Sequence, residues 1–163
     1  MLAMKRKIFW LGQPHPNLVE NIRERVAQHA GTTPEHSAII RAVSDCIAEW
    51  SNPNNPWHRT FVQKTSEQHT LRGLERQPRN YYVWPKNFVE LRTASAQLTA
   101  ELGSSIDESM LIRLALEEIA TRFECGDSSF ISGFSHKVQK NIAPKGRAST
   151  KLLGGAFLPM ASD

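Results

Sequence analysis

Histidine and cysteine are the side chains with which proteins most often bind metal ions or exchange protons near neutral pH. The chain has six histidines and two cysteines, scattered along its length: His15, His29, His36, Cys46, His58, His69, Cys125 and His136. Neither cysteine has metal-ligand spacing to any histidine. The sequence also lacks a glycine-rich phosphate loop and a serine–histidine–aspartate grouping. We therefore predict no catalytic residue, no metal site and no cofactor, and we expect the protein not to be an enzyme.

Basic residues are the other group whose chemistry the sequence makes visible. The 163 residues have a formal net charge of +4 and a pI near 9.3, which favours a polyanionic partner modestly. The two cysteines do not suggest a disulfide framework, and this favours a reducing compartment. Apolar runs are shorter than the roughly 20 residues of a membrane span. We expect a cytoplasmic bacterial protein that does not bind membranes.

The elements that would position the basic side chains are clearest in the second half of the chain. Residues 81–84 have the aromatic and β-branched content of a strand, and Pro85 follows them. Apolar residues then recur at helical spacing as far as Gly103, which suits the left-handed end of a helix. Ser105 is expected to cap a second helix, with Glu108 completing a capping box. The pattern predicts a strand, a helix, a turn and a second helix.

The first half of the chain repeats this pattern 72 positions earlier. The same offset aligns residues of several types: Gly31 with Gly103, Thr33 with Ser105, Ser37 with Ser109, Ile40 with Ile112, Arg41 with Arg113, Phe9 with Tyr81, Trp10 with Tyr82, and Leu11 with Val83. Amphipathic helices produce apolar matches by chance, but they do not readily produce the glycine, serine and arginine matches in one register. We predict a tandem repeat whose copies of about 45 residues pack together, because one copy alone buries too little apolar surface.

Four segments follow from this reading. Residues 1–50 form the first unit, 51–77 a polar linker, 78–125 the second unit, and 126–163 a flexible tail. Trp10 and Trp84 are expected in the core. Arg41 and Arg113 are expected to bond helix-end carbonyls or carboxylates.

A strand, a helix, a turn and a helix in about 45 residues resemble the ribbon-helix-helix family of DNA-binding proteins, of the Arc and MetJ type. The resemblance is carried by Val83-Trp84-Pro85, the turn Gly103-Ser104-Ser105 and the pair Ile112-Arg113. Two copies in one polypeptide are similar to TraY-type conjugation proteins and to the overdrive-binding accessory protein of T-DNA transfer. The resemblance implies a mainly α fold with a two-stranded antiparallel ribbon, duplicated internally as a pseudo-dimer in one chain.

The family resemblance also implies where DNA would bind. A β-ribbon fits the major groove, and the side chains on one of its faces read base edges. Strand alternation groups the expected base-contacting residues on one face: Lys5, Lys7, Phe9, Arg79 and Tyr81. Amides at the start of each unit's last helix would bind phosphate, which gives four expected phosphate-contacting residues: Thr32, Thr33, Ser104 and Ser105.

We therefore expect sequence-specific binding to double-stranded DNA. Because the two strands differ, the expected target is an imperfect inverted repeat. The resemblance implies an accessory factor of the plasmid conjugation relaxosome, with a relaxase or another conjugation protein as partner, or a transcriptional autoregulator. The sequence leaves open whether the monomeric pseudo-dimers associate on adjacent sites. The alternative is an antitoxin or adaptor that binds a partner protein through the tail or through apolar residues of the ribbon.

Overall fold

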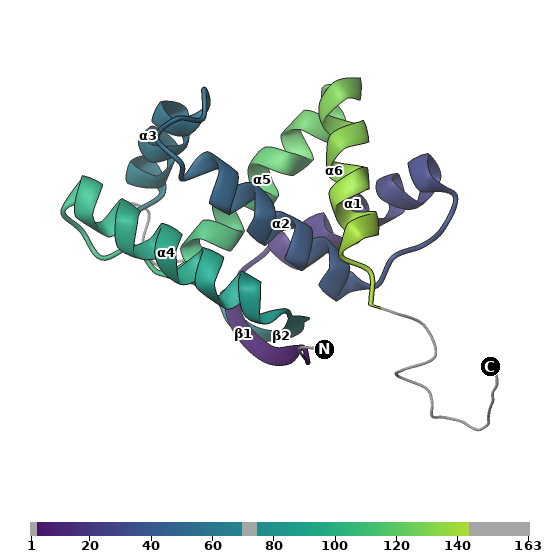
Figure 1. Cartoon of the computed structure of the whole chain (residues 1–163), viewed down its shortest axis with the longest axis horizontal. Helices are drawn as coiled ribbons and strands as arrows, with labels where there is room; N and C mark the ends of the chain where they lie inside the picture. The colour runs from purple at the N-terminus through teal and green to yellow at the C-terminus, as the bar shows by residue number, and fades with distance from the viewer. Residues whose placement is uncertain (1–2, 70–74, 144–163) are drawn as a thin grey trace.

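A computed structural model describes residues 3–69 and 75–143 of the chain (Figure 1). This part is mainly helical and contains one two-stranded sheet. The elements in chain order are β1 (Lys5–Leu11), α1 (His15–Ala30), α2 (His36–Trp50), α3 (His58–His69), β2 (Gln77–Val83), α4 (Pro85–Leu102), α5 (Glu108–Glu124) and α6 (Ser128–Lys140).

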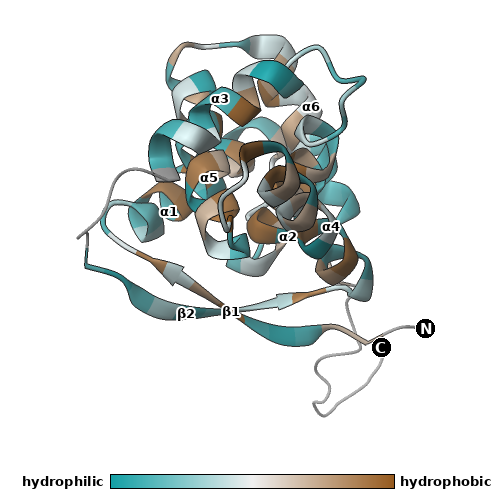
Figure 2. Ribbon diagram, turned by 90° about the vertical axis from the view of Figure 1, so that its left-hand side faces the viewer, coloured by the Kyte–Doolittle hydropathy of each residue, from teal (hydrophilic) through white to brown (hydrophobic). Residues whose placement is uncertain are grey.

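The two strands form an antiparallel ribbon in which Ile8 lies opposite Asn80, Lys5 opposite Val83 and Leu11 opposite Gln77. Figure 2 shows the ribbon along one side of the helices, so that one of its faces is covered and the other is not. The predicted mainly α fold with an antiparallel ribbon is therefore confirmed, and strands 66 residues apart in the chain, at Leu11 and Gln77, are brought together.

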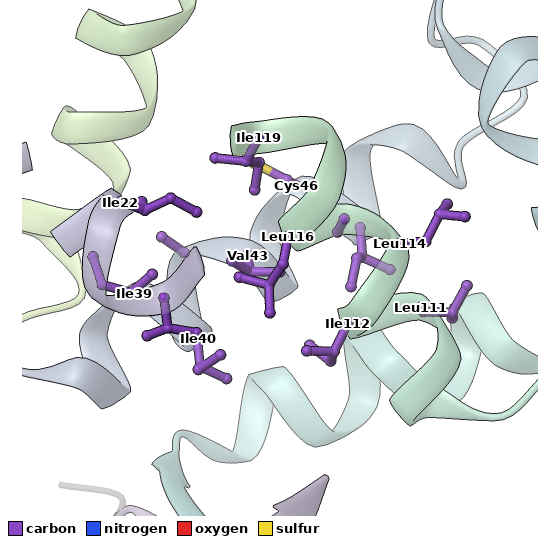
Figure 3. Close-up of a cluster of buried hydrophobic side chains, with 14 of the residues drawn as sticks. Ile22, Ile39, Ile40, Val43, Cys46, Leu111, Ile112, Leu114, Leu116 and Ile119 are labelled. Carbon is purple, nitrogen blue, oxygen red and sulfur yellow. The ribbon is translucent and has the colours of Figure 1, made fainter. Parts of the chain in front are cut away.

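Helices α2 and α5 supply the centre of the core. Both have apolar residues almost all round, as expected for helices that are covered on every side. Figure 3 shows Val43 of α2 close to Leu116 of α5, with Ile22 of α1 at the edge of the same cluster. The ribbon closes this core from below with Phe9, Leu11, Tyr81 and Val83.

The helix ends agree with the sequence in their glycines but not in their caps. Gly31 and Gly103 follow α1 and α4 with φ of 82° and 70°, values that residues with a side chain rarely adopt. Thr33 and Ser105 are not the N-caps that the sequence suggested. Glu35 and Asp107 occupy those positions, two residues later, and the Asp107 carboxylate accepts a hydrogen bond from the Met110 amide at 2.7 Å.

The segment predicted as a linker contains a helix, and this prediction was wrong for residues 58–69. Helix α3 buries Phe61 and Thr65, and the Phe61 ring lies 5.7 Å from that of Trp50. His58 at its start donates from Nδ1 to the Trp50 carbonyl at 3.0 Å, and its Nε2 lies 3.1 Å from Oε1 of Glu101 on α4. Helix α3 therefore packs against α4 and α5, whereas residues 70–74 of the predicted linker lie outside the described residues.

The segment predicted as a flexible tail also begins with a packed helix. In α6, Phe134 and Val138 are buried, and Phe130 packs beside them. The Asp127 carboxylate caps the helix by accepting from the Phe130 amide at 3.1 Å. The prediction of a flexible tail is wrong for residues 128–140, whereas the basic and apolar residues expected between 144 and 163 lie outside the described residues.

Candidate nucleic-acid interface

The uncovered face of the ribbon is formed by every second residue of each strand. Inward-pointing Phe9, Leu11, Tyr81 and Val83 are buried against the helices. Alternation then sends their neighbours outward, and these residues are exposed. We call this set the outer face: Arg6, Ile8, Trp10, Pro78, Asn80 and Tyr82. In register, Arg6 lies opposite Tyr82, Ile8 opposite Asn80 and Trp10 opposite Pro78.

The face assignment made from the sequence was the wrong one. Phe9 and Tyr81, expected to contact bases, are 0% and 8% exposed, whereas Trp10, expected in the core, is 51% exposed. In both strands, each of the two alternating sets of residues contains an aromatic side chain. The alternation alone therefore did not show which set faces the helices. Leu11 and Val83, on the same face as Phe9 and Tyr81, are also buried against the helices.

Lys7, another expected base-contacting residue, is engaged on the helical side of the ribbon. Its Nζ lies 2.8 Å from the Glu108 carboxylate and within 5.6 Å of the ring centres of Phe9 and Phe88. Its stem thus covers apolar rings while its charge is paired at the rim of the core. This position does not suit contact with a base edge.

Lys5 and Arg79 are exposed, as predicted, although they belong to the same alternating set as the buried residues of their strands. Lys5 lies at the outer end of β1, and Arg79 lies opposite Phe9 in the register. The two strands together carry Lys5, Arg6, Lys7 and Arg79 and no acidic residue. The ribbon is therefore a basic element, independently of which face its cations occupy.

At one end of the outer face, helix α5 holds the main chain of Trp10. The Trp10 amide donates to Ser109 Oγ at 2.9 Å, and the Trp10 carbonyl accepts from Arg113 Nη1 at 2.6 Å. Pro78, opposite Trp10, has no amide hydrogen to donate. Because the Trp10 amide bonds to α5 and not across the ribbon, this pair makes no inter-strand hydrogen bond that proline would remove.

At the other end, helix α2 holds Tyr82 through a serine hydroxyl and an arginine guanidinium, as α5 holds Trp10. The Tyr82 amide donates to Ser37 Oγ at 2.9 Å, and the Tyr82 carbonyl accepts from Arg41 Nη1 at 2.7 Å. Each of these residues lies 72 positions from its counterpart at the first end. Each strand is thus fastened by a helix from the other half of the chain.

Arg41 has further partners, which confirms its predicted structural role. Its Nε donates to the Asn141 carbonyl just after α6 at 2.8 Å, and its guanidinium also pairs with Glu35. The side chain is 0% exposed, which a guanidinium tolerates only when its donors are occupied. Arg41 therefore joins α2, the ribbon and the end of α6.

The expected phosphate-contacting residues lie in the two turns before α2 and α5. Thr32, Thr33 and Ser105 are exposed and Ser104 is half-buried. Acidic side chains occupy the caps that follow, and Glu108 adds a carboxylate in the first turn of α5. These carboxylates stabilise the positive end of each helix dipole and oppose a phosphate at the same position.

Metal clusters and membrane-spanning helices are two further features that the described residues can be checked for. Residues 3–69 and 75–143 contain no cluster of three or more histidine, cysteine, aspartate or glutamate side chains that could hold a metal ion. None of the helices described is both long enough and apolar enough to cross a bilayer.

Comparisons with family models, curated proteins and solved structures found no match to this chain.

Proposed function

We propose that the protein binds double-stranded DNA by laying the outer face of its ribbon in the major groove. The observation that supports this most is a basic two-stranded ribbon with helices on one side only, so that a whole row of side chains is free to meet a ligand. The major groove, about 12 Å wide, admits a two-stranded β-ribbon.

We also propose that the chain is an internal duplication of a ribbon-helix-helix unit. The two strand-fastening contacts support this, since Ser37 and Arg41 in the first half and Ser109 and Arg113 in the second bond equivalent main-chain atoms. Equal offsets in glycine, serine and arginine positions are hard to obtain without a common unit. The resemblance to tandem conjugation proteins supports a relaxosome accessory factor, or a transcriptional autoregulator, as the biological role.

Arg6 and Asn80 are the base-reading residues of the proposed interface. A guanidinium donates two hydrogen bonds to guanine O6 and N7, and a carboxamide pairs in the same way with adenine N6 and N7. The equivalent positions in the other strand hold Pro78 and Ile8, which offer no such pairing. The two halves of the target therefore differ, and the proposed site is an imperfect inverted repeat.

A second function is favoured by the apolar part of the outer face. Ile8, Trp10 and Tyr82 are 48%, 51% and 53% exposed, and exposed apolar patches commonly mark protein interfaces. In this alternative the ribbon binds a partner protein, as an adaptor or antitoxin would.

Selection from a random pool of duplex oligonucleotides, followed by titration of the enriched duplex at fixed ionic strength, tests the proposal. The double variant R6A/N80A should bind that duplex at least about thirtyfold more weakly, because two bidentate contacts worth about 1–3 kcal/mol each are removed. No enrichment over the starting pool would reject DNA reading and favour a protein partner.

The matched control is R59A. Arg59 is exposed on α3, which lies away from the ribbon, and its removal changes the net charge as the loss of Arg6 does. R59A should lower affinity only slightly, through the general attraction to phosphates. Equal losses in both variants would mean that Arg6 acts through its charge alone.

A further inference from the structure

The outer face is more apolar than hydrogen bonding to base edges requires. Ile8, Trp10 and Tyr82 are about half exposed, and Val89 on α4 is the only other large hydrophobic side chain with comparable exposure among the described residues. Three of four such side chains are therefore concentrated on one face of a seven-residue ribbon. Water contact with this surface is unfavourable, so a ligand with apolar groups at matching positions would gain from covering it.

The main chain of the two aromatic residues is fixed in advance. Trp10 and Tyr82 are the ribbon residues whose amide and carbonyl both bond to helix side chains, at distances of 2.6–2.9 Å. Their rings have no aromatic or cation–π partner within residues 3–69 and 75–143. Each ring is thus carried on a rigid support and left free to contact a ligand.

The apolar group that the major groove displays is the C5-methyl of thymine. We infer that the outer face recognises thymine methyl groups, with Trp10 and Tyr82 as the two methyl-contacting residues at its ends and Ile8 between them. This inference rests on the proposed DNA binding and deepens it by naming the base feature that is read. Aromatic and aliphatic surfaces contact a methyl group without the directional demands of a hydrogen bond.

The register sets the spacing of these contacts. Trp10 lies beside Pro78 and Tyr82 beside Arg6, so the two rings are four residue positions apart along the ribbon. At about 3.3 Å per residue this is about 13 Å. Base pairs succeed one another every 3.4 Å or so, which places the two thymines about three to four base pairs apart. Ile8 would meet the pairs between them.

Replacement of thymine by deoxyuridine in the enriched duplex tests the inference, because it removes the methyl group and leaves base pairing intact. The unmodified protein should bind the deoxyuridine duplex about tenfold more weakly, the effect of losing two buried methyl contacts. The double variant W10A/Y82A should bind both duplexes with nearly equal affinity. The variant W10F/Y82F, which keeps two rings, should retain most of the preference for thymine.

Three results would overturn the inference. Equal binding of thymine and deoxyuridine duplexes by the unmodified protein would do so, as would a tenfold preference that survives in W10A/Y82A. An enriched duplex without thymines at the stated spacing would contradict it as well. In each of these cases R6A/N80A can still weaken binding, which leaves the proposed DNA reading in place. Failure to enrich any duplex would reject both proposals together.

Discussion

Arg113 and Arg41 donate to main-chain carbonyls at opposite ends of the ribbon, yet their surroundings differ. Arg113 bonds the Trp10 carbonyl, and burial together with nearby Arg76 lowers its pKa. Arg41 bonds the Tyr82 carbonyl, the Asn141 carbonyl and Glu35, and stands 5.6 Å over the Trp84 ring. One end is held by a single helix, whereas the other is also tied, through Arg41, to the main chain just after α6.

This difference shows what the extra helices add to two similar halves. Helix α6 packs its aromatic residues between α1, α2 and α5, and its last turn closes over Arg41. On α5, Arg122 lies within 5.2 Å of the ring centres of Trp50, Trp57 and Phe130, which binds α6 and the start of α3 to the core. The Tyr82 end of the ribbon should therefore be the more rigid one.

The largest loss of stability is expected when the packing of α6 against the core is weakened. The Phe134 side chain is 1% exposed and lies edge-on to Phe123 at 5.8 Å and beside Phe130 at 5.9 Å. F134A should lower the free energy of unfolding by about 3–5 kcal/mol, as measured by urea denaturation, because a buried ring leaves a cavity. S129A, an exposed change in the same helix, should cost less than about 0.5 kcal/mol. A loss in F134A no larger than in S129A would mean that α6 adds nothing to the fold.

The comparison of the two arginines comes next in size. R41A should cost about 3 kcal/mol, since buried carbonyls of Tyr82 and Asn141 lose their donor and Glu35 loses its cation. R113A should cost about 1–2 kcal/mol, because one carbonyl is affected. Urea denaturation of both variants measures the difference. In the F134A background the two losses should become more alike, and equal losses in the unmodified background would contradict the proposed asymmetry.

Features that depend on local chemistry could be predicted from the sequence. Glycine at positions 31 and 103 implied left-handed helix ends, and the aromatic and β-branched residues around 7–11 and 81–84 implied two strands. These follow from backbone sterics and side-chain shape, which neighbouring residues determine. The antiparallel pairing was predicted from the repeat, since two strands at equal positions in two units can meet only if the units pack together.

The inward face of the ribbon could not be predicted in the same way. Phe9 and Trp10 are both aromatic, and the choice between them depends on the shape of the helical surface below. Lys7 was expected to face outward because it is charged, and this favoured the same outward direction for Phe9. Its ion pair partner Glu108 is 101 positions away in the sequence, so no local pattern indicated the pairing. The sequence thus predicted the ribbon itself, but not which of its faces is buried.

Helix α6 did leave a signal that was overlooked. Phe130, Phe134 and Val138 recur every four residues after the capping residue Asp127, which is the pattern of an amphipathic helix. Serines and Gly133 between them suggested a flexible tail instead. Burial of the three apolar side chains outweighed these weak helix formers, as tertiary packing commonly does.

The smallest effect concerns a carboxylate pair on one side of the molecule. Glu90 of α4 lies next to Asp45 of α2, while the position 72 residues before Glu90 holds Leu18. Burial, and secondarily Asp45, raises the pKa of Glu90, although its Oε1 accepts from Asn87 and Ser44 at 3.0 Å. A carboxyl whose pKa is higher in the folded than in the unfolded state opposes folding once it is ionised. Stability should therefore fall as pH rises through the folded pKa of Glu90.

E90Q removes this charge while keeping the oxygen that Asn87 and Ser44 bond. At pH 7 the variant should be more stable by less than about 1 kcal/mol, because Glu90 is only half-buried and solvent screens much of the repulsion. Its stability should also vary less with pH between the unfolded and folded pKa values of the glutamate. Urea denaturation at several pH values measures both effects, and E24Q, at an exposed position of α1, is the control. Lower stability of E90Q at pH 7 would show that hydrogen bonds to the ionised carboxylate outweigh its burial, and would remove this difference between the two halves.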